Sequence, residues 1–230
     1  MQNEIDKIVD RYERRKTITD GRYGRLNPEV IAWTQERQRA LVSLLEAQGI
    51  HDLAGMDVLE IGCGSGSNLQ ELLLLGAEPE HLVGNELLFE RTAQARRMLP
   101  QVLRIFPGDA SVLPFEEESF DIVYQSTVFS SILDDGLQGR IAEAMWRWVR
   151  PGGGILWYDF TFNNPSNPDV RGMPLRRIKA LFPYGRINAR RVTLAPPIAR
   201  RVVRLHQKMY GVFNALYLLR THILCFIQKP

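Results

Sequence analysis

The chain has 230 residues, of which 45% are hydrophobic and 24% charged, and this composition is typical of a soluble globular protein. No apolar run reaches the roughly 20 residues that a membrane-spanning helix needs, and the polar start of the chain does not resemble a secretion signal. The only two cysteines, Cys63 and Cys225, form no disulfide framework. We therefore expect one main domain in a cytoplasmic protein.

The net charge of +3 conceals an uneven distribution of charge. Residues 170–230 contain 13 Lys and Arg and no Asp or Glu. The first 169 residues carry the other 16 basic residues and all 26 acidic ones, a net charge of −10. Such a basic segment either is a solvated face or binds an anionic partner, which can be a substrate, a membrane surface or nucleic acid. The sequence leaves both interpretations open.

Helix-like and strand-like segments alternate along the chain. After a helix over about 28–48, we expect strands over 56–61, 81–86, 102–106, 120–125 and 155–160, with helices over 67–75, 89–98 and 137–149 between them. A short helix over 174–182, a strand over 187–194, a helical stretch from 196 to about 219 and a strand over 223–227 complete the pattern. This alternation predicts an α/β protein with a doubly wound, seven-stranded sheet.

A glycine-rich loop follows the first expected strand. Gly62, Gly64 and Gly66 have the spacing Gly-x-Gly-x-Gly, whereas the dinucleotide fingerprint is Gly-x-Gly-x-x-Gly. Glycines allow a backbone to approach a ligand closely, because a Cβ atom would collide with it. Glu60, two residues before the first glycine, suits a cationic ligand better than a pyrophosphate. The loop therefore predicts a nucleotide-type site for a ligand that carries positive charge.

The segment Val58-Leu59-Glu60-Ile61-Gly62-Cys63-Gly64-Ser65-Gly66 resembles motif I of class I S-adenosylmethionine (SAM)-dependent methyltransferases, in particular those of type 11. Four further matches follow in order, over about residues 50–160: Glu86, Asp109-Ala110, Leu113 to Val123, and Val149 to Gly153. The resemblance implies a Rossmann-like fold with strands one to five parallel and the last strand antiparallel. It also implies a helical lid over 1–50 and a SAM-binding domain over 51–230, with substrate-side insertions at about 161–186 and 195–220.

The resemblance also implies the cofactor contacts. Glu86 would bind the ribose hydroxyls, Asp109 the adenine amine, and Glu60 the ligand directly or through water. The complete predicted cofactor set is Glu60, Gly62, Cys63, Gly64, Gly66, Asn68, Glu86, Leu87, Asp109, Ala110, Gln125 and Ser126. The product would be S-adenosylhomocysteine. No metal is expected, because no His or Cys cluster has zinc-like spacing and only Asp159 and Asp169 lie near the acceptor side.

Methyl transfer from a sulfonium requires an acceptor that is held in line and deprotonated where necessary. We expect the acceptor over the carboxyl ends of strands four and five. Asp159 is the general-base candidate, with Tyr158 and His222 as further catalytic candidates; a loop cap, a packing residue and a structural histidine are the respective alternatives. The predicted substrate contacts are Thr127, Phe129, Asn163, Asn164 and Arg171, with Tyr12 and Tyr23 from the lid.

The acceptor itself is indicated only by a second resemblance. Residues 157–172 and 191–197 resemble a bacterial subgroup encoded among polysaccharide-assembly genes, which implies O-methylation of a hydroxyl on a sugar, glycan or other small molecule, anionic ones included. Two other functions stay open: an RNA-modifying methyltransferase that uses the basic region, and a non-catalytic SAM-binding assembly protein that docks through 196–220. That stretch packs under the sheet edge or lies on a membrane surface. No DNA partner is expected.

Overall fold

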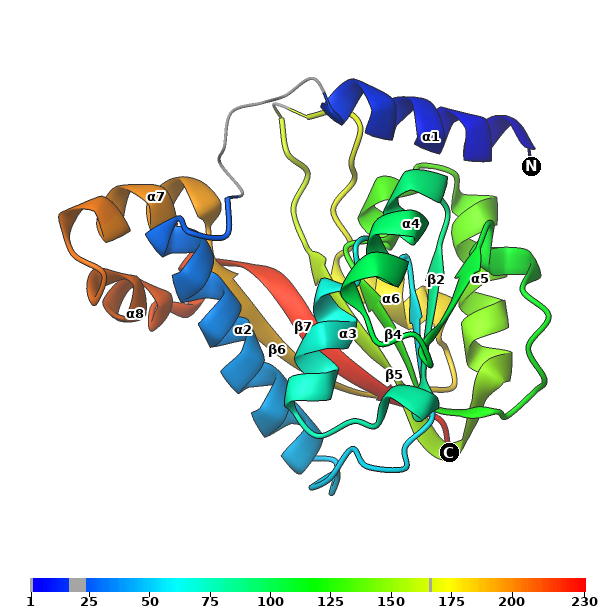
Figure 1. The fold of residues 1–230 in the computed structure, drawn as a ribbon. Helices are drawn as coiled ribbons and strands as arrows, with labels where there is room; N and C mark the ends of the chain where they lie inside the picture. The colour runs from blue at the N-terminus through cyan, green and yellow to red at the C-terminus, as the bar shows by residue number, and fades with distance from the viewer. Residues whose placement is uncertain (1, 17–23, 166) are drawn as a thin grey trace.

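The computed structural model describes residues 2–16, 24–165 and 167–230, and its centre is a seven-stranded sheet with helices on both faces (Figure 1). The strand order is β3-β2-β1-β4-β5-β7-β6. The strands are β1 (Val58–Ile61), β2 (Leu82–Glu86), β3 (Arg104–Pro107), β4 (Phe120–Ser126), β5 (Val149–Phe160), β6 (Arg186–Leu194) and β7 (Arg220–Gln228). Strands β1 to β5 are parallel, and β7 is antiparallel to both of its neighbours. The predicted fold class is confirmed.

Helices cover the two faces of the sheet in separate groups. One hydrophobic core joins alternate strand residues to α5 (Asp135–Trp148) and α6 (Leu175–Leu181). The other core joins the remaining strand residues to α2 (Pro28–Glu46), α3 (Ser67–Leu74) and α4 (Phe89–Met98). Successive side chains of a strand point to opposite faces of the sheet. A strand that is covered on both faces therefore has a continuous run of apolar residues in its sequence.

Two segments differ from the sequence-based expectation. β5 begins at Val149 and includes the glycine-rich stretch expected to be a turn. The backbones of Gly152 and Gly153 bond to Lys229, which extends the pairing of β5 with β7. The helical stretch after Pro196 breaks at His206, whose backbone is extended, and so divides into α7 (Pro196–Leu205), α8 (Met209–Asn214) and the short 3-10 helix η4 (Tyr217–Leu219).

The carboxyl ends of β1, β2, β4 and β5 meet at one edge of the sheet, and α1 (Gln2–Lys16) lies over this edge (Figure 1). Ligands of open parallel sheets bind at such an edge, where the strand order reverses. Here the reversal falls between β1 and β4. In the described part of the chain, no helix combines the length and apolarity needed to cross a bilayer.

Candidate functional site

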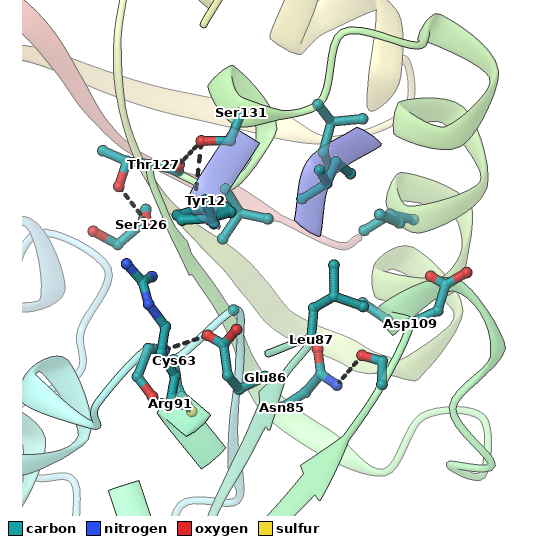
Figure 2. A pocket seen from close by; sticks show the side chains of 18 of the residues that line it. Tyr12, Cys63, Asn85, Glu86, Leu87, Arg91, Asp109, Ser126, Thr127 and Ser131 are labelled. Carbon is teal, nitrogen blue, oxygen red and sulfur yellow. Dashed lines mark hydrogen bonds between the residues drawn. The ribbon is translucent and has the colours of Figure 1, made fainter. Parts of the chain in front are cut away.

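A pocket of about 400 Å³ opens at the carboxyl ends of β1, β2 and β4 (Figure 2). Five stretches of chain line it: α1, the glycine loop, the end of β2 with the start of α4, the loop 108–110, and residues 126–141. Nine of the twelve predicted cofactor residues are among the lining residues: Gly62, Cys63, Gly64, Asn68, Glu86, Leu87, Asp109, Ala110 and Ser126. Thr127 and Tyr12, both predicted to contact the substrate, line it too.

The glycines of the loop serve two different purposes. Gly62 and Gly64 both have positive φ angles, of 61° and 59°. A Cβ atom on Gly62 would lie 2.4 Å from Cγ2 of Val128, so this glycine is needed for packing against the loop after β4. A Cβ atom on Gly64 would meet only Nη1 of Arg91, at 4.0 Å. A side chain at Gly64 would therefore occupy the pocket itself.

The acid at the end of β2 organises the loop. One carboxylate oxygen of Glu86 accepts the backbone N–H of Gly64 at 2.8 Å, and the other accepts that of Leu88 at 2.8 Å. Beside it, the amide of Asn85 donates to the carbonyls of Phe106 and Gly108, which fixes the loop after β3. The end of β2 therefore holds both backbone walls of the pocket, and Glu86 keeps lone pairs free to accept bonds from a ligand.

Asp109 caps the short helix η2 (Ala110–Val112) by accepting the backbone N–H of Ser111 at 2.8 Å. Apolar side chains from two helices surround this end of the pocket: Ile5 and Ile8 from α1, and Leu137 and Ile141 from α5. Apolar walls with a carboxylate at the rim suit a flat, amine-bearing ring. The adenine role of Asp109 stays a prediction.

Helix α1 closes the pocket from the opposite side. The Tyr12 hydroxyl lies 3.3 Å from Oγ of Ser131, and the guanidinium of Arg91 lies over the Tyr12 ring at 4.5 Å from its centroid. Arg11, which is buried, donates to the carbonyl of Ser131 at 3.3 Å and to Glu4 at 2.7 Å. Figure 2 shows Tyr12 on one side of the pocket and Cys63, Asn85 and Glu86 on the other. The predicted contact Tyr23 lies outside the described residues.

The end of β4 enters the pocket through an unusual backbone conformation. Thr127 has a φ angle of 58°, which a β-branched residue rarely adopts. Its N–H donates to the carbonyl of Tyr158 at 2.8 Å, and its carbonyl accepts the hydroxyls of Ser130 and Ser131. Non-glycine residues with such angles cluster at functional sites. Here the turn places Ser126 and Thr127 on the pocket wall.

Three predicted cofactor residues do not reach the pocket surface. Glu60 is fully buried and accepts a hydrogen bond of 2.6 Å from the amide of Asn68. Gly66 packs against Leu99, and Gln125 is fully buried, where its amide oxygen accepts the N–H of Val128 at 3.1 Å. Glu60 and Gln125 lie behind the pocket, because strand residues next to its mouth alternate between the two faces of the sheet, and Gly66 is turned toward Leu99 at the start of α3. They support residues that do line it.

The three catalytic candidates also lie away from the pocket lining. Asp159 is 0% exposed, and its carboxylate accepts the N–H groups of Ser130 and Phe160. Tyr158 bonds to the Thr193 hydroxyl at 2.9 Å and stacks on His222. Burial and the nearby Arg37 lower the pKa of His222 to about 4, so this imidazole is neutral and weakly basic. The structure thus favours the structural alternatives for all three residues.

The remaining predicted substrate contacts form other interactions. Phe129 is fully buried in the core, at 4.5 Å from the ring of Trp157. The side chain of Asn163 accepts the N–H of Gly172 at 2.9 Å, and the exposed Asn164 accepts the N–H of Asn167 through its carbonyl. Arg171 pairs with Asp135. The structure does not bring these four residues to the pocket: Phe129 packs in the core, and the loop after β5, which holds the other three, folds onto itself and onto α5.

A buried polar network under the glycine loop was not anticipated from the sequence. Arg37 of α2 donates to Oδ1 of Asn68 at 2.8 Å and to the Tyr124 hydroxyl at 3.2 Å, and it pairs with Glu71 of α3. Asn68 in turn donates to Glu60. The pocket-lining Asn68 is therefore oriented by the guanidinium of Arg37 and the carboxyl group of Glu60 behind it. Such a network connects elements far apart in the sequence, so no local motif indicates it.

The free energy of unfolding is expected to fall as the pH rises from about 4.5 to about 7. Burial raises the pKa of Glu60 from 4.5 to about 7, and it raises that of Asp159 from 3.8 to about 7. The native protein therefore retains protons that the unfolded chain releases in this window, so stability is lost as these groups ionise. Urea titrations across the window measure the effect. Glu60→Gln should flatten the slope, whereas a slope unchanged from wild type would contradict the assignment; Glu46→Gln, at an exposed position, is the control.

Comparisons with known proteins agree with this geometry. A family model described as a methyltransferase domain matches residues 59–157. The match covers less than half of the chain, and it identifies this segment as a methyltransferase domain. Across 154 residues the chain is 33% identical to phthiotriol/phenolphthiotriol dimycocerosates methyltransferase 1 of Mycobacterium ulcerans, a match that covers 63% of this chain and 54% of that protein. It is 32% identical over 111 residues to the tRNA N(3)-methylcytidine methyltransferase Mettl2 of Drosophila melanogaster, covering 45% of this chain and 34% of that one.

The chain thus spans about half the length, or less, of these two curated relatives. Among solved structures, a SAM-dependent methyltransferase from Archaeoglobus fulgidus is similar with a TM-score of 0.60 at 14% identity, covering 85% of this chain and 96% of that one. The [4+2]-cyclase SpnF is similar with a TM-score of 0.62 at 16% identity, covering 86% and 83%. At these identities the likeness shows the fold alone, and the methyltransferase fold also serves a cyclase.

The residues of the methyltransferase domain fit SAM. Gly64 and Gly108 both line the pocket with positive φ angles, and no protein atom lies closer than 4.0 Å to a Cβ atom built on either. Carboxylates of Glu86 and Asp109 are hydrogen-bond acceptors that suit ribose hydroxyls and an adenine amine. Among the described residues, no group of three or more His, Cys, Asp or Glu side chains is arranged to hold a metal ion.

Proposed function

We propose that this protein transfers the methyl group of SAM to an oxygen, a hydroxyl of a small-molecule, sugar or glycan acceptor. The observation that carries the proposal is the pocket in which Gly64, Glu86 and Asp109 meet at the switch point of the sheet. When bound, SAM supplies a methyl group that its sulfonium already activates. The chain then has to bind the cofactor, hold the acceptor in line and exclude water.

The pocket residues divide between these tasks. The glycine loop, Glu86 and Asp109 bind the cofactor, and the helix α1 covers it. Ser126 and Thr127 supply hydroxyl groups at the opposite wall and orient the acceptor, with Tyr12 above them. No described side chain of Asp, Glu or His lines this part of the pocket besides Glu86 and Asp109. We therefore assign orientation rather than strong general-base catalysis to the acceptor side.

Two relatives support different acceptor classes. The Mycobacterium ulcerans relative by its name methylates a triol derivative, in line with a hydroxyl acceptor. The Drosophila melanogaster relative by its name methylates tRNA, in line with the basic residues 170–230. We favour the hydroxyl acceptor, because the Mycobacterium ulcerans relative matches 63% of this chain and the Drosophila melanogaster relative 45%. We also propose that the protein works in the cytoplasm, without a metal.

Titration calorimetry with SAM and with S-adenosylhomocysteine is expected to give one binding site for each ligand. Labelled SAM incubated with sugar nucleotides, glycans and hydroxylated lipids should then transfer label to one of these acceptors and not to total RNA. If the ligands bind in the pocket, Glu86→Ala should lose the binding of SAM and S-adenosylhomocysteine. Glu78→Ala should retain it, because Glu78 is exposed and does not line the pocket. A folded protein that binds neither ligand would contradict the proposal. Label found in RNA alone would show that the acceptor is RNA and not a hydroxyl-bearing small molecule, sugar or glycan.

A further inference from the structure

The segment 196–219, which contains α7, α8 and η4, connects β6 to β7 and projects from the sheet (Figure 1). We call it the helical insert. Fourteen large hydrophobic side chains of the described chain are exposed, and five of them lie within residues 205–218: Leu205, Val212, Leu216, Tyr217 and Leu218. Leu205 and Leu218 are 81% and 85% exposed. Such a concentration of exposed apolar side chains marks an interaction surface.

The inner face of the insert already has its partners. Ala199, Val202, Val203 and Tyr210 are buried, and they pack with Leu194 at the end of β6 and with residues of α2. The hydroxyl of Tyr210 also accepts the N–H of Leu194. The exposed side chains therefore do not belong to an incomplete core. They form an outer face on a segment that is anchored to the domain.

Basic side chains accompany this outer face. Arg201, Arg204 and Lys208 are exposed, and Arg200 is half-exposed. No ion pair with another described residue neutralises any of these four. No acidic residue occurs anywhere between positions 170 and 230. The outer face thus combines leucines with uncompensated positive charge.

We propose that the helical insert docks on the surface of a lipid bilayer that contains anionic lipids. Amphipathic helices with Lys and Arg on one side and Leu or aromatic residues on the other bind such surfaces in the interfacial plane. Each basic residue gains from the negative potential of the headgroups, and the leucines gain from the acyl boundary. A nucleic acid would satisfy the arginines but not Leu216 or Leu218. In a symmetric dimer through this face, the same positive charges would meet each other.

The helical insert lies at the same edge of the sheet as the pocket. β6 runs parallel to β5, since both are antiparallel to β7, so its carboxyl end lies at the same edge of the sheet as the pocket. The insert leaves the sheet at that end. Tyr217 is held there by the guanidinium of Arg191, 5.4 Å from its ring centroid, and tyrosines favour the membrane interface. A docked protein would present the pocket side of the sheet to molecules held in the bilayer.

Vesicle co-sedimentation of the full chain tests the proposal without SAM or acceptor, so its outcome is independent of methyl transfer. The protein should bind phosphatidylcholine vesicles that contain phosphatidylglycerol, and not vesicles of phosphatidylcholine alone. Added salt should weaken the binding. We expect the affinity for these vesicles to fall at least about tenfold in each of two double variants. Leu216→Asp/Leu218→Asp replaces two apolar side chains by acidic ones, and Arg201→Glu/Arg204→Glu reverses two positive charges.

Two control variants carry a single change of the same kind elsewhere on the surface, and Leu218→Asp and Arg204→Glu are the single insert variants to which they are compared. Leu74→Asp changes an exposed leucine of α3, and Arg97→Glu changes an exposed arginine of α4; both should bind like wild type. The proposal is overturned by a wild-type protein that ignores anionic vesicles, or by equal losses in the control and insert variants. It is also overturned by a dimer that Leu216→Asp/Leu218→Asp dissociates, or by RNA binding that depends on Arg201 and Arg204 when vesicle binding is absent.

Discussion

Replacing Gly64 by leucine is expected to abolish SAM binding and to leave the fold intact. A side chain at this position extends into the pocket, where it meets nothing of the protein closer than Arg91. It would occupy the space that the proposed function gives to the cofactor. We expect the affinity for SAM and for S-adenosylhomocysteine to fall at least about 100-fold, a loss of about 2.7 kcal/mol in binding free energy. Titration calorimetry measures this loss.

Gly55→Leu is the matched control for this variant. Gly55 also has a positive φ angle, of 68°, and open space around its Cβ direction, but it lies in the turn before β1 and outside the pocket lining. A left-handed backbone costs a non-glycine residue about 1–2 kcal/mol, so both variants should lose similar stability in urea titrations. SAM affinity should fall only in Gly64→Leu. Equal affinity in the two variants would show that the pocket is not the cofactor site.

The cofactor half of the pocket is predictable from the sequence because local rules determine it. A strand followed by glycines at fixed spacing can only turn in a few ways, and the acid at the end of the next parallel strand must lie beside that turn. Gly64, Glu86 and Asp109 line the pocket for this reason. The strand order follows from the same alternation of strands and helices. Local sequence therefore determines most of the fold and the floor of the site.

The acceptor half is not predictable in this way, because it depends on contacts between distant segments. The candidates Asp159 and Phe129 lie near the carboxyl ends of strands, as Glu86 does, yet both are fully buried and neither lines the pocket. The lid contact between Tyr12 and Ser131 spans 119 positions. The role of Arg91 could not be predicted, because the sequence does not distinguish an arginine in the first turn of a surface helix from an ordinary solvated one. Its contact with the ring of Tyr12 depends on where α1 packs.

Arg37 illustrates the same limit on the cofactor side, since it connects α2 to the pocket through Asn68. Its side chain is 14% exposed and that of Glu71 10%. Removing one member of a buried ion pair leaves the other charge without compensation. In addition, Asn68 would lose the hydrogen bond that Arg37 donates to it. Asn68 would then be oriented only by the hydrogen bond that it donates to Glu60. The network therefore links the stability of the α2–α3 contact to the shape of the glycine loop.

Arg37→Met is expected to lower the free energy of unfolding by about 3–5 kcal/mol, because Glu71 loses its partner in a buried ion pair. SAM affinity should also fall in the folded fraction, since Asn68 lines the pocket. Arg150→Met is the matched control. Arg150 also contacts two carboxylates, Asp57 and Asp121, each at 2.8 Å, but its side chain is 37% exposed. Exposed pairs contribute little, so this variant should lose no more than about 1 kcal/mol.

A second substitution separates the charge effect from a simple loss of packing. In Arg37→Met/Glu71→Met both members of the buried pair become apolar, and no uncompensated charge remains at Glu71. Such replacements are frequently neutral, so the double variant should be more stable than Arg37→Met alone in urea titrations. If the two losses instead add, the side chains act independently and the network does not hold the loop. SAM affinity is expected to stay reduced in the double variant, because Arg37 orients Asn68 whether or not Glu71 is charged.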